Sequence, residues 1–150
     1  MQILFVCLGN ICRSPLAEGI LREKLSSQPY IIIDSAGTGN WHAGEAPDRR
    51  SVATAREFGI DISSQRARQV VSADFEQFDL ILAMDEQNRL DLLKIAPEHA
   101  AHKIHRILDF AGMGGAGVPD PWFGELDGFR DVYLLLEQAC ENIKERLLKG

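Results

Sequence analysis

Short apolar runs alternate with helical patterns along the chain. Four runs are rich in β-branched and aromatic residues and short enough to be buried strands. They span residues 3–7, 30–33, 78–84 and 103–107. The segments between and after them predict helices over residues 14–25, 47–58, 86–95 and 128–148. Strands alternating with helices indicate a parallel sheet with right-handed crossovers. The pattern therefore predicts one α/β domain over residues 1–150, with a small parallel sheet of about four strands flanked by helices on both faces.

Residues that favour helix ends support these boundaries. Ser14 and Pro15 predict an N-cap and a first helical position. Gly59 ends the second predicted helix, and Pro97 follows the third. The glycine-rich stretch 112–119 predicts a loop inside the domain.

Composition and charge narrow the function classes. Sixteen Lys and Arg against 22 Asp and Glu give a formal net charge of −6, which argues against nucleic acid or an anionic membrane as the main partner. No apolar run approaches the ~20 residues of a membrane helix. Met1 leads directly into an apolar strand, so we expect no signal peptide. Three cysteines are an odd and small number, which favours reduced thiols and a cytoplasmic location.

The most informative segment is Cys7-Leu-Gly-Asn-Ile-Cys-Arg13, between the first predicted strand and the first predicted helix. Ligands of an open parallel sheet bind beyond the carboxyl ends of its strands, where this segment falls. A loop of this length that enters a helix can direct several backbone N–H groups at one phosphate. Gly9 and Asn10 tolerate the positive φ that such a tight loop often requires.

The same loop carries the groups that phosphoryl transfer needs. The helix N-terminus and the guanidinium of Arg13 favour the thiolate of Cys7, a nucleophile toward phosphorus. Arg13 has the planar fork that matches two phosphate oxygens. The hydroxyl of Ser14 can cap the helix and also hydrogen-bond to the thiolate.

The spacing between Cys7 and Arg13 does not by itself show a catalytic role, because a cysteine at a strand end is usually a small buried hydrophobic residue. Its place at a strand end, just before Ser14 and Pro15 open a helix, favours the phosphate-binding interpretation. No Gly-Lys-Ser/Thr sequence follows, so the segment is not a nucleotide-binding P-loop.

Several segments together resemble the low-molecular-weight protein tyrosine phosphatases. The segment from Phe5 to Pro15, Phe-Val-Cys-Leu-Gly-Asn-Ile-Cys-Arg-Ser-Pro, is similar to the family signature almost residue for residue. The similarity continues through Asp34-Ser-Ala-Gly37, Trp41-His-Ala-Gly44, Ala67-Arg-Gln-Val70, Met84-Asp-Glu86 and Asp120-Pro-Trp-Phe-Gly124. The resemblance implies a flavodoxin-like fold and hydrolysis of phosphotyrosine and other aryl phosphate monoesters.

The resemblance also implies roles for individual residues. Cys7 would be the nucleophile, Arg13 the phosphate clamp and Asp120 the general acid and then the general base. The substrate would be bound by Leu8, Gly9, Asn10, Ile11, Cys12, Ser14, Trp41 and Trp122. Asn10 would join Ser35 in a polar network, and Cys12 would trap an oxidised Cys7 as a disulfide. No metal or organic cofactor is expected; the partners would be phosphotyrosine-containing proteins or peptides, with phosphate and vanadate as inhibitors.

Two positions depart from the family pattern. Trp122 and Phe123 stand where the family often has two tyrosines, so regulation by phosphorylation there is excluded while an aromatic wall is kept. Gln65 stands where many members have a histidine that supports the loop network, and its side chain could hydrogen-bond in the same place.

Three other functions could use a similar loop. An arsenate reductase on the same fold needs two further relay cysteines, and Cys140 alone cannot supply them. A cysteine-phosphate carrier of a sugar phosphotransferase system does not fit Arg13 and Asp120. A non-catalytic phosphotyrosine-binding module needs neither nucleophile nor acid, so the presence of both Cys7 and Asp120 argues against it.

Further polar residues have simpler explanations than catalysis. His99, His102 and His105 lack a cysteine or carboxylate cluster that would complete a metal site. Asp85 follows a predicted strand and is expected to cap the next helix. Cys140 lies on the apolar face of the last predicted helix, so we expect it to be inert core.

Overall fold

The computed structural model describes residues 1–122, 124 and 126–149. Its sheet has four strands: β1 (Gln2–Cys7), β2 (Ile32–Gly37), β3 (Leu80–Ala83) and β4 (Ile104–Arg106). They lie in the order β2-β1-β3-β4 and every neighbouring pair is parallel. The predicted α/β class and the small parallel sheet are confirmed.

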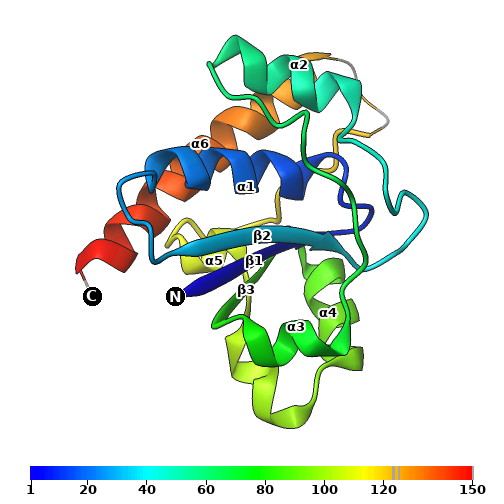
Figure 1. Cartoon of the computed structure of the whole chain (residues 1–150), viewed down its shortest axis with the longest axis vertical. Coiled ribbons are helices and arrows are strands. Elements are labelled where there is room, and N and C mark those ends of the chain that lie inside the picture. Colours follow the sequence, from blue (N-terminus) through cyan, green and yellow to red (C-terminus); the bar gives the residue numbers. More distant parts are fainter. Residues whose placement is uncertain (123, 125, 150) are drawn as a thin grey trace.

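Helices cover both faces of this sheet, as predicted (Figure 1). They are α1 (Arg13–Lys24), α2 (Arg49–Glu57), α3 (Ser72–Gln77), α4 (Glu86–Ile95), α5 (Ile107–Phe110) and α6 (Leu126–Lys149), with a 3₁₀ helix, η1 (Glu98–Lys103). Helices α1, α2 and α6 lie on one side of the sheet, and α3 and α4 lie on the other (Figure 1). Helix α3, η1 and the four-residue α5 were not predicted, because such short elements show too little periodicity.

The alternation of side chains along β1 separates two apolar layers. Ile3 and Phe5 pack into the layer that holds residues of α1 and α6. Leu4 and Val6 pack into the opposite layer, with residues of α3 and α4. Since β1 is central and buried on both faces, its carboxyl end is a rigid base for the loop that follows Cys7.

The predicted strand over residues 30–33 was placed too early. Tyr30 is 88% exposed, and pairing with β1 begins only at Ile32. The strand then continues through Asp34 and Ser35, whose polar side chains hide it from a search for apolar runs. Both side chains have partners in the fold, since Asp34 pairs with Arg68 and Ser35 joins a buried network.

The predicted N-cap at Ser14 was also wrong. Helix α1 begins one residue earlier, at Arg13, and its N-cap is Cys12. Ser14 is fully buried within the first turn, where its hydroxyl contacts Asn10 and Cys7. The hydroxyl is therefore engaged with the loop and does not cap the helix.

Among the described residues, no helix has the length and apolarity needed to span a membrane.

Candidate active site

The loop between β1 and α1 is shaped by two local features. Asn10 has a φ of 58°, the left-handed conformation that its residue type tolerates. Gly37, at the end of β2, approaches the loop so closely that a Cβ there would lie 2.8 Å from the Leu8 carbonyl oxygen. The sequence thus places a turn-forming residue and a glycine where the backbone needs them.

Cys7 is buried at the base of this loop. Its Sγ accepts a hydrogen bond from the Asn10 backbone N–H at 3.3 Å and lies 3.0 Å from the Ser14 hydroxyl oxygen. The sulfur therefore has two hydrogen-bond partners, one in the loop and one in the first turn of α1.

A buried polar network supports the loop from below. The side-chain amide of Asn10 donates to Ser14 Oγ at 2.9 Å and to Ser35 Oγ at 3.0 Å. Ser35 in turn donates to the carboxylate of Glu18 at 2.6 Å, and the Arg68 backbone N–H donates to Asn10 Oδ1 at 3.0 Å. Burial raises the pKa of Glu18. The hydrogen bond from Ser35 acts in the opposite direction and lowers this pKa. Every polar group of Asn10's side chain is used, so its conformation is fixed.

Gln65 lies apart from this network. Its Nε2 donates to the Pro15 carbonyl in α1 at 3.1 Å. The side chain therefore braces the first turn of α1.

Arg13 is held at the back of the site by the end of β3. Its Nη1 donates to Asp85 Oδ2 at 2.7 Å and to the Val118 carbonyl at 2.9 Å. Asp85 also caps α4, since its Oδ1 accepts from the Asn88 N–H at 2.8 Å, as predicted. The ion pair between Asp85 and Arg13 was not predicted. Its sequence signal was that Arg13 and Asp85 both lie just beyond the carboxyl ends of predicted strands, which prove to be the neighbouring strands β1 and β3.

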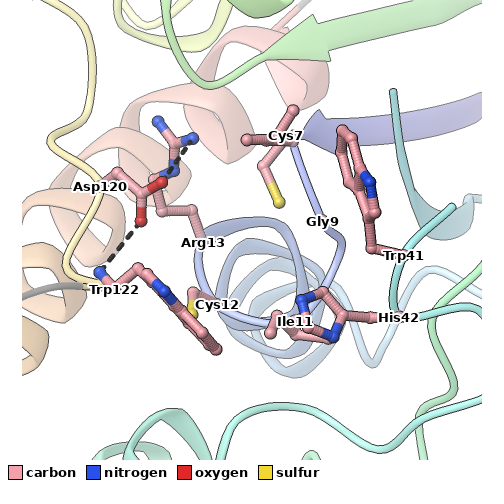
Figure 2. Close-up of a pocket in the computed structure, with 10 residues that line it drawn as sticks. Cys7, Gly9, Ile11, Cys12, Arg13, Trp41, His42, Asp120 and Trp122 are labelled. Carbon is pink, nitrogen blue, oxygen red and sulfur yellow. Dashed lines mark hydrogen bonds and ion pairs between the residues drawn. The ribbon is translucent and has the colours of Figure 1, made fainter. Parts of the chain in front are cut away.

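Asp120 lies across the cleft from Cys7, beside Arg13 (Figure 2). Its Oδ2 is 3.7 Å from Arg13 Nη2. Its Oδ1 accepts from the Trp122 backbone N–H at 3.0 Å, which fixes the carboxylate within a tight turn. The side chain is 41% exposed, so the carboxylate can reach a group that enters from solvent.

These residues surround a cleft of about 210 Å³. Its lining consists of Cys7, Leu8, Gly9, Ile11, Cys12, Arg13, Trp41, His42, Asp120 and Trp122. Trp41 and His42 stand on one side, and Trp122 and Asp120 on the other (Figure 2). The side chains of Asn10 and Ser14 are buried outside the lining, where their hydrogen bonds support the loop.

His42 was not predicted as a site residue. Its ring is 5.7 Å from the Trp122 ring, and its Nδ1 lies 3.0 Å from Glu45 Oε2. The contact between His42 and Gly9 of the loop exists only in the folded protein. In the sequence, the position of His42 next to Trp41 was the available indication that it belongs to the site. Phe123, which was predicted to continue the aromatic wall, lies outside the described residues.

Cys12 is a second, chemically different thiol in the cleft. Burial, followed by the nearby charges of Asp48, Cys7 and Asp120, raises its pKa to about 12. Cys12 is therefore a neutral thiol at physiological pH. Cys140 is fully buried on α6, as predicted, and burial raises its pKa as well.

The described part of the chain contains no cluster of three His, Cys, Asp or Glu side chains that could hold a metal ion. His99 instead lies 2.6 Å from Glu76 at the surface. The positive charge in the cleft comes from Arg13 and the backbone of the loop.

Comparison with known proteins identifies the family. The family model for low molecular weight phosphotyrosine protein phosphatases matches residues 2–150. The chain belongs to this family. It is 39% identical to the low molecular weight protein-tyrosine-phosphatase YfkJ of Bacillus subtilis, over 99% of this chain and 97% of that protein. The chain is therefore an enzyme, a protein-tyrosine-phosphatase.

Two solved structures are also similar to it. A protein tyrosine phosphatase from Entamoeba histolytica, solved with Hepes in its active site, has a TM-score of 0.94 and 41% identity, covering 100% of this chain and 98% of that one. Wzb of Vibrio vulnificus, solved in complex with benzylphosphonate, has a TM-score of 0.87 and 30% identity, with 97% of each chain covered. The fold and the family agree with the resemblance seen in the sequence.

Proposed function

We propose that this phosphatase hydrolyses phosphotyrosine and other aryl phosphate monoesters through a cysteinyl-phosphate intermediate on Cys7. The observation that carries the proposal is the convergence of Cys7, Arg13 and Asp120 on one cleft. A sulfur nucleophile, a bidentate cation and an exposed carboxylate are the three groups that this chemistry needs.

In the first step the Cys7 thiolate attacks phosphorus and the bond from phosphorus to the tyrosine oxygen breaks. Arg13 and the loop N–H groups hold the equatorial phosphoryl oxygens, where charge is spread in the transition state. Asp120, protonated, gives its proton to the leaving phenolate oxygen. Ser14, 3.0 Å from Cys7 Sγ, stabilises the thiolate.

In the second step the Asp120 carboxylate takes a proton from water. The water oxygen attacks phosphorus, the sulfur–phosphorus bond breaks, and Cys7 returns as a thiolate while inorganic phosphate leaves. The same carboxylate serves as acid and then as base, as microscopic reversibility allows. No step needs a metal ion, and phosphate and vanadate should inhibit by occupying the phosphoryl position.

Specificity for aryl esters follows from the walls of the cleft. Trp41 and Trp122 stand on opposite sides, where a phenyl ring between them would bury apolar area. The benzylphosphonate bound by the Wzb relative also combines a phenyl ring with a phosphonate group, joined through one methylene carbon. Phosphoserine is too short to reach Cys7 while it fills the same walls. Phosphotyrosine-containing proteins or peptides are thus the proposed partners.

Replacing Trp41 should weaken this specificity. Trp41 is 70% exposed, and its indole packs against Gly39 so closely that a Cβ there would come within 1.9 Å of it. We expect Trp41→Ala to lower kcat/KM for phosphotyrosine peptides about tenfold, equivalent to ~1.4 kcal/mol, with little change for phosphoserine peptides. Tyr30→Ala, an exposed aromatic at the opposite end of β2, is the matched control. An unchanged ratio between the two substrates would remove Trp41 from the specificity argument.

Cys12 is proposed to protect an oxidised nucleophile. Peroxide converts the Cys7 thiolate to a sulfenic acid; the Cys12 thiolate then attacks that sulfur and hydroxide leaves, which forms a disulfide. We expect reversible inactivation, with poorer recovery in Cys12→Ser. Because the pKa of Cys12 is about 12, disulfide formation after removal of peroxide by catalase should accelerate with rising pH. Mass spectrometry that finds no Cys7–Cys12 linkage would refute the protective role.

A simple assay separates this function from its rivals. The protein should hydrolyse p-nitrophenyl phosphate in the presence of a metal chelator, and vanadate should block the reaction. A binding module or a phosphocysteine carrier would release no phosphate. Arsenate reduction would need relay thiols, and Cys140 is buried against the Ala17 carbonyl of α1. The three unpaired cysteines of the described chain fit the proposed cytoplasmic location, where thiols stay reduced.

A further inference from the structure

Arg50, on the first turn of α2, contacts the turn that carries Asp120 through two backbone carbonyl groups. Its Nη1 donates to the Gly124 carbonyl at 2.9 Å, and its Nη2 donates to the Trp122 carbonyl at 3.0 Å. Its guanidinium also lies over two aromatic rings, 4.5 Å from the Phe129 centroid and 5.6 Å from that of Trp122. One side chain thus holds the acid-bearing turn by hydrogen bonds and by stacking.

Among the described residues, the segment that carries Asp120 is also held by Arg13, whose Nη1 donates to the Val118 carbonyl and whose Nη2 lies 3.7 Å from Asp120 Oδ2. The internal bonds of the turn run from the Trp122 N–H to Asp120 Oδ1 and from the Gly124 N–H to the Pro121 carbonyl. These bonds set the shape of the turn but not its distance from Cys7. The hydrogen bonds of Arg50 to the Trp122 and Gly124 carbonyl groups attach this turn to α2.

The start of α2 is in turn attached to the phosphate-binding loop. The Asp48 N–H donates to the Ile11 carbonyl at 2.7 Å, and Ser51 Oγ lies 3.4 Å from the Cys12 carbonyl. Asp48 also receives Nε and Nη2 of Arg50, each at 3.0 Å. The chain of contacts therefore runs from the nucleophile's loop through Asp48 and Arg50 to the turn of the acid.

We propose that Arg50 is a positioning residue that sets the place of the general acid Asp120 relative to the nucleophile's loop. This inference rests on the proposed function, because it needs Asp120 to protonate the leaving group. Burial opposes ionisation of Asp48, but its bonds with Arg50 outweigh burial and lower the pKa of its carboxyl. The pair therefore stays charged and bonded over the working pH range, which keeps Arg50 aimed at the turn.

The geometry requires an arginine. The guanidinium makes four hydrogen bonds to four acceptor atoms on three residues, Asp48, Trp122 and Gly124. A lysine ammonium is a point charge that cannot span these acceptors from one position. Arg49, the exposed neighbour on the same turn, offers a matched control for loss of one positive charge.

The test compares Arg50→Met, Arg50→Lys and Arg49→Met with esters of two leaving groups. Phenyl phosphate needs a proton on its leaving oxygen, whereas 2,4-dinitrophenyl phosphate does not. We expect Arg50→Met to lower kcat/KM for phenyl phosphate at least tenfold and to change that for the dinitrophenyl ester less than threefold. For phenyl phosphate, the kcat/KM of Arg50→Lys should lie between the values of Arg50→Met and wild type. The kcat/KM of Arg49→Met should equal the wild-type value with both esters.

A double variant gives the sharper readout. Because Arg50 acts through Asp120, Arg50→Met should cost little further activity toward phenyl phosphate in an Asp120→Ala background. Equal losses with both esters, or full additivity with Asp120→Ala, would overturn the inference while leaving the proposed function in place. A wild-type protein that hydrolyses neither ester would overturn the proposed function itself. If Arg50→Met does not fold, as judged by urea unfolding, the same comparison with Arg50→Lys decides the matter.

Discussion

Cys7→Ser should abolish turnover and leave the fold intact. This is the largest effect we expect, because a serine hydroxyl in the same place is not ionised near neutral pH and cannot replace the thiolate. Loss of a nucleophile should lower kcat on the order of 10⁴-fold or more. The hydrogen-bond partners of Cys7, the Asn10 N–H and the Ser14 hydroxyl, remain available to the serine oxygen.

Binding should survive this substitution, since Arg13 and the loop amides are unchanged. Fluorescence titration with a phosphotyrosine peptide, together with a urea unfolding curve, checks this expectation. A Cys7→Ser protein that keeps substantial turnover would remove Cys7 as nucleophile. One that unfolds would show that the thiol has a structural role instead.

Asp120→Ala should separate substrates by their leaving groups. A phenolate is a poor leaving group and needs the proton that Asp120 supplies, so kcat/KM for phenyl phosphate should fall by roughly 10²–10⁴-fold. For 2,4-dinitrophenyl phosphate the value should stay close to wild type. The ratio kcat/KM is the right measure because it reports formation of the cysteinyl-phosphate, before water enters.

Asp131→Ala is the control for removal of an exposed carboxylate outside the cleft lining, since Asp131 is exposed on α6. In this control, kcat/KM for both esters should stay at the wild-type value. Equal losses of kcat/KM for the two esters in Asp120→Ala would contradict the general-acid assignment and would point instead to a role in binding.

The sequence predicted the parts of the site that are local. Cys7 and Arg13 lie on one short loop between a strand and a helix, so their proximity follows from spacing alone. The buried strands β1 and β3 were visible as apolar runs. Strand β2 was misplaced because Asp34 and Ser35 are polar residues that have partners only in the folded protein.

The parts that depend on packing between distant segments could not be predicted in the same way. Arg50 lies over 70 residues from the carbonyl groups that it holds. Asp85 was predicted as a helix cap from its neighbours, and its second oxygen bonds to Arg13 because strands β1 and β3 lie side by side. Nothing adjacent to His42 in the sequence indicates that its ring reaches the Trp122 ring.

The cysteinyl-phosphate on Cys7 is tested most directly by trapping it. Asp120→Ala lacks the base that activates water, so the intermediate should accumulate when a good leaving group makes its formation fast. Acid quenching of this variant during turnover of 2,4-dinitrophenyl phosphate, followed by peptide mass spectrometry, should find one phosphoryl group on Cys7. Unmodified Cys7 throughout turnover, or a phosphoryl group on another residue, would contradict the account.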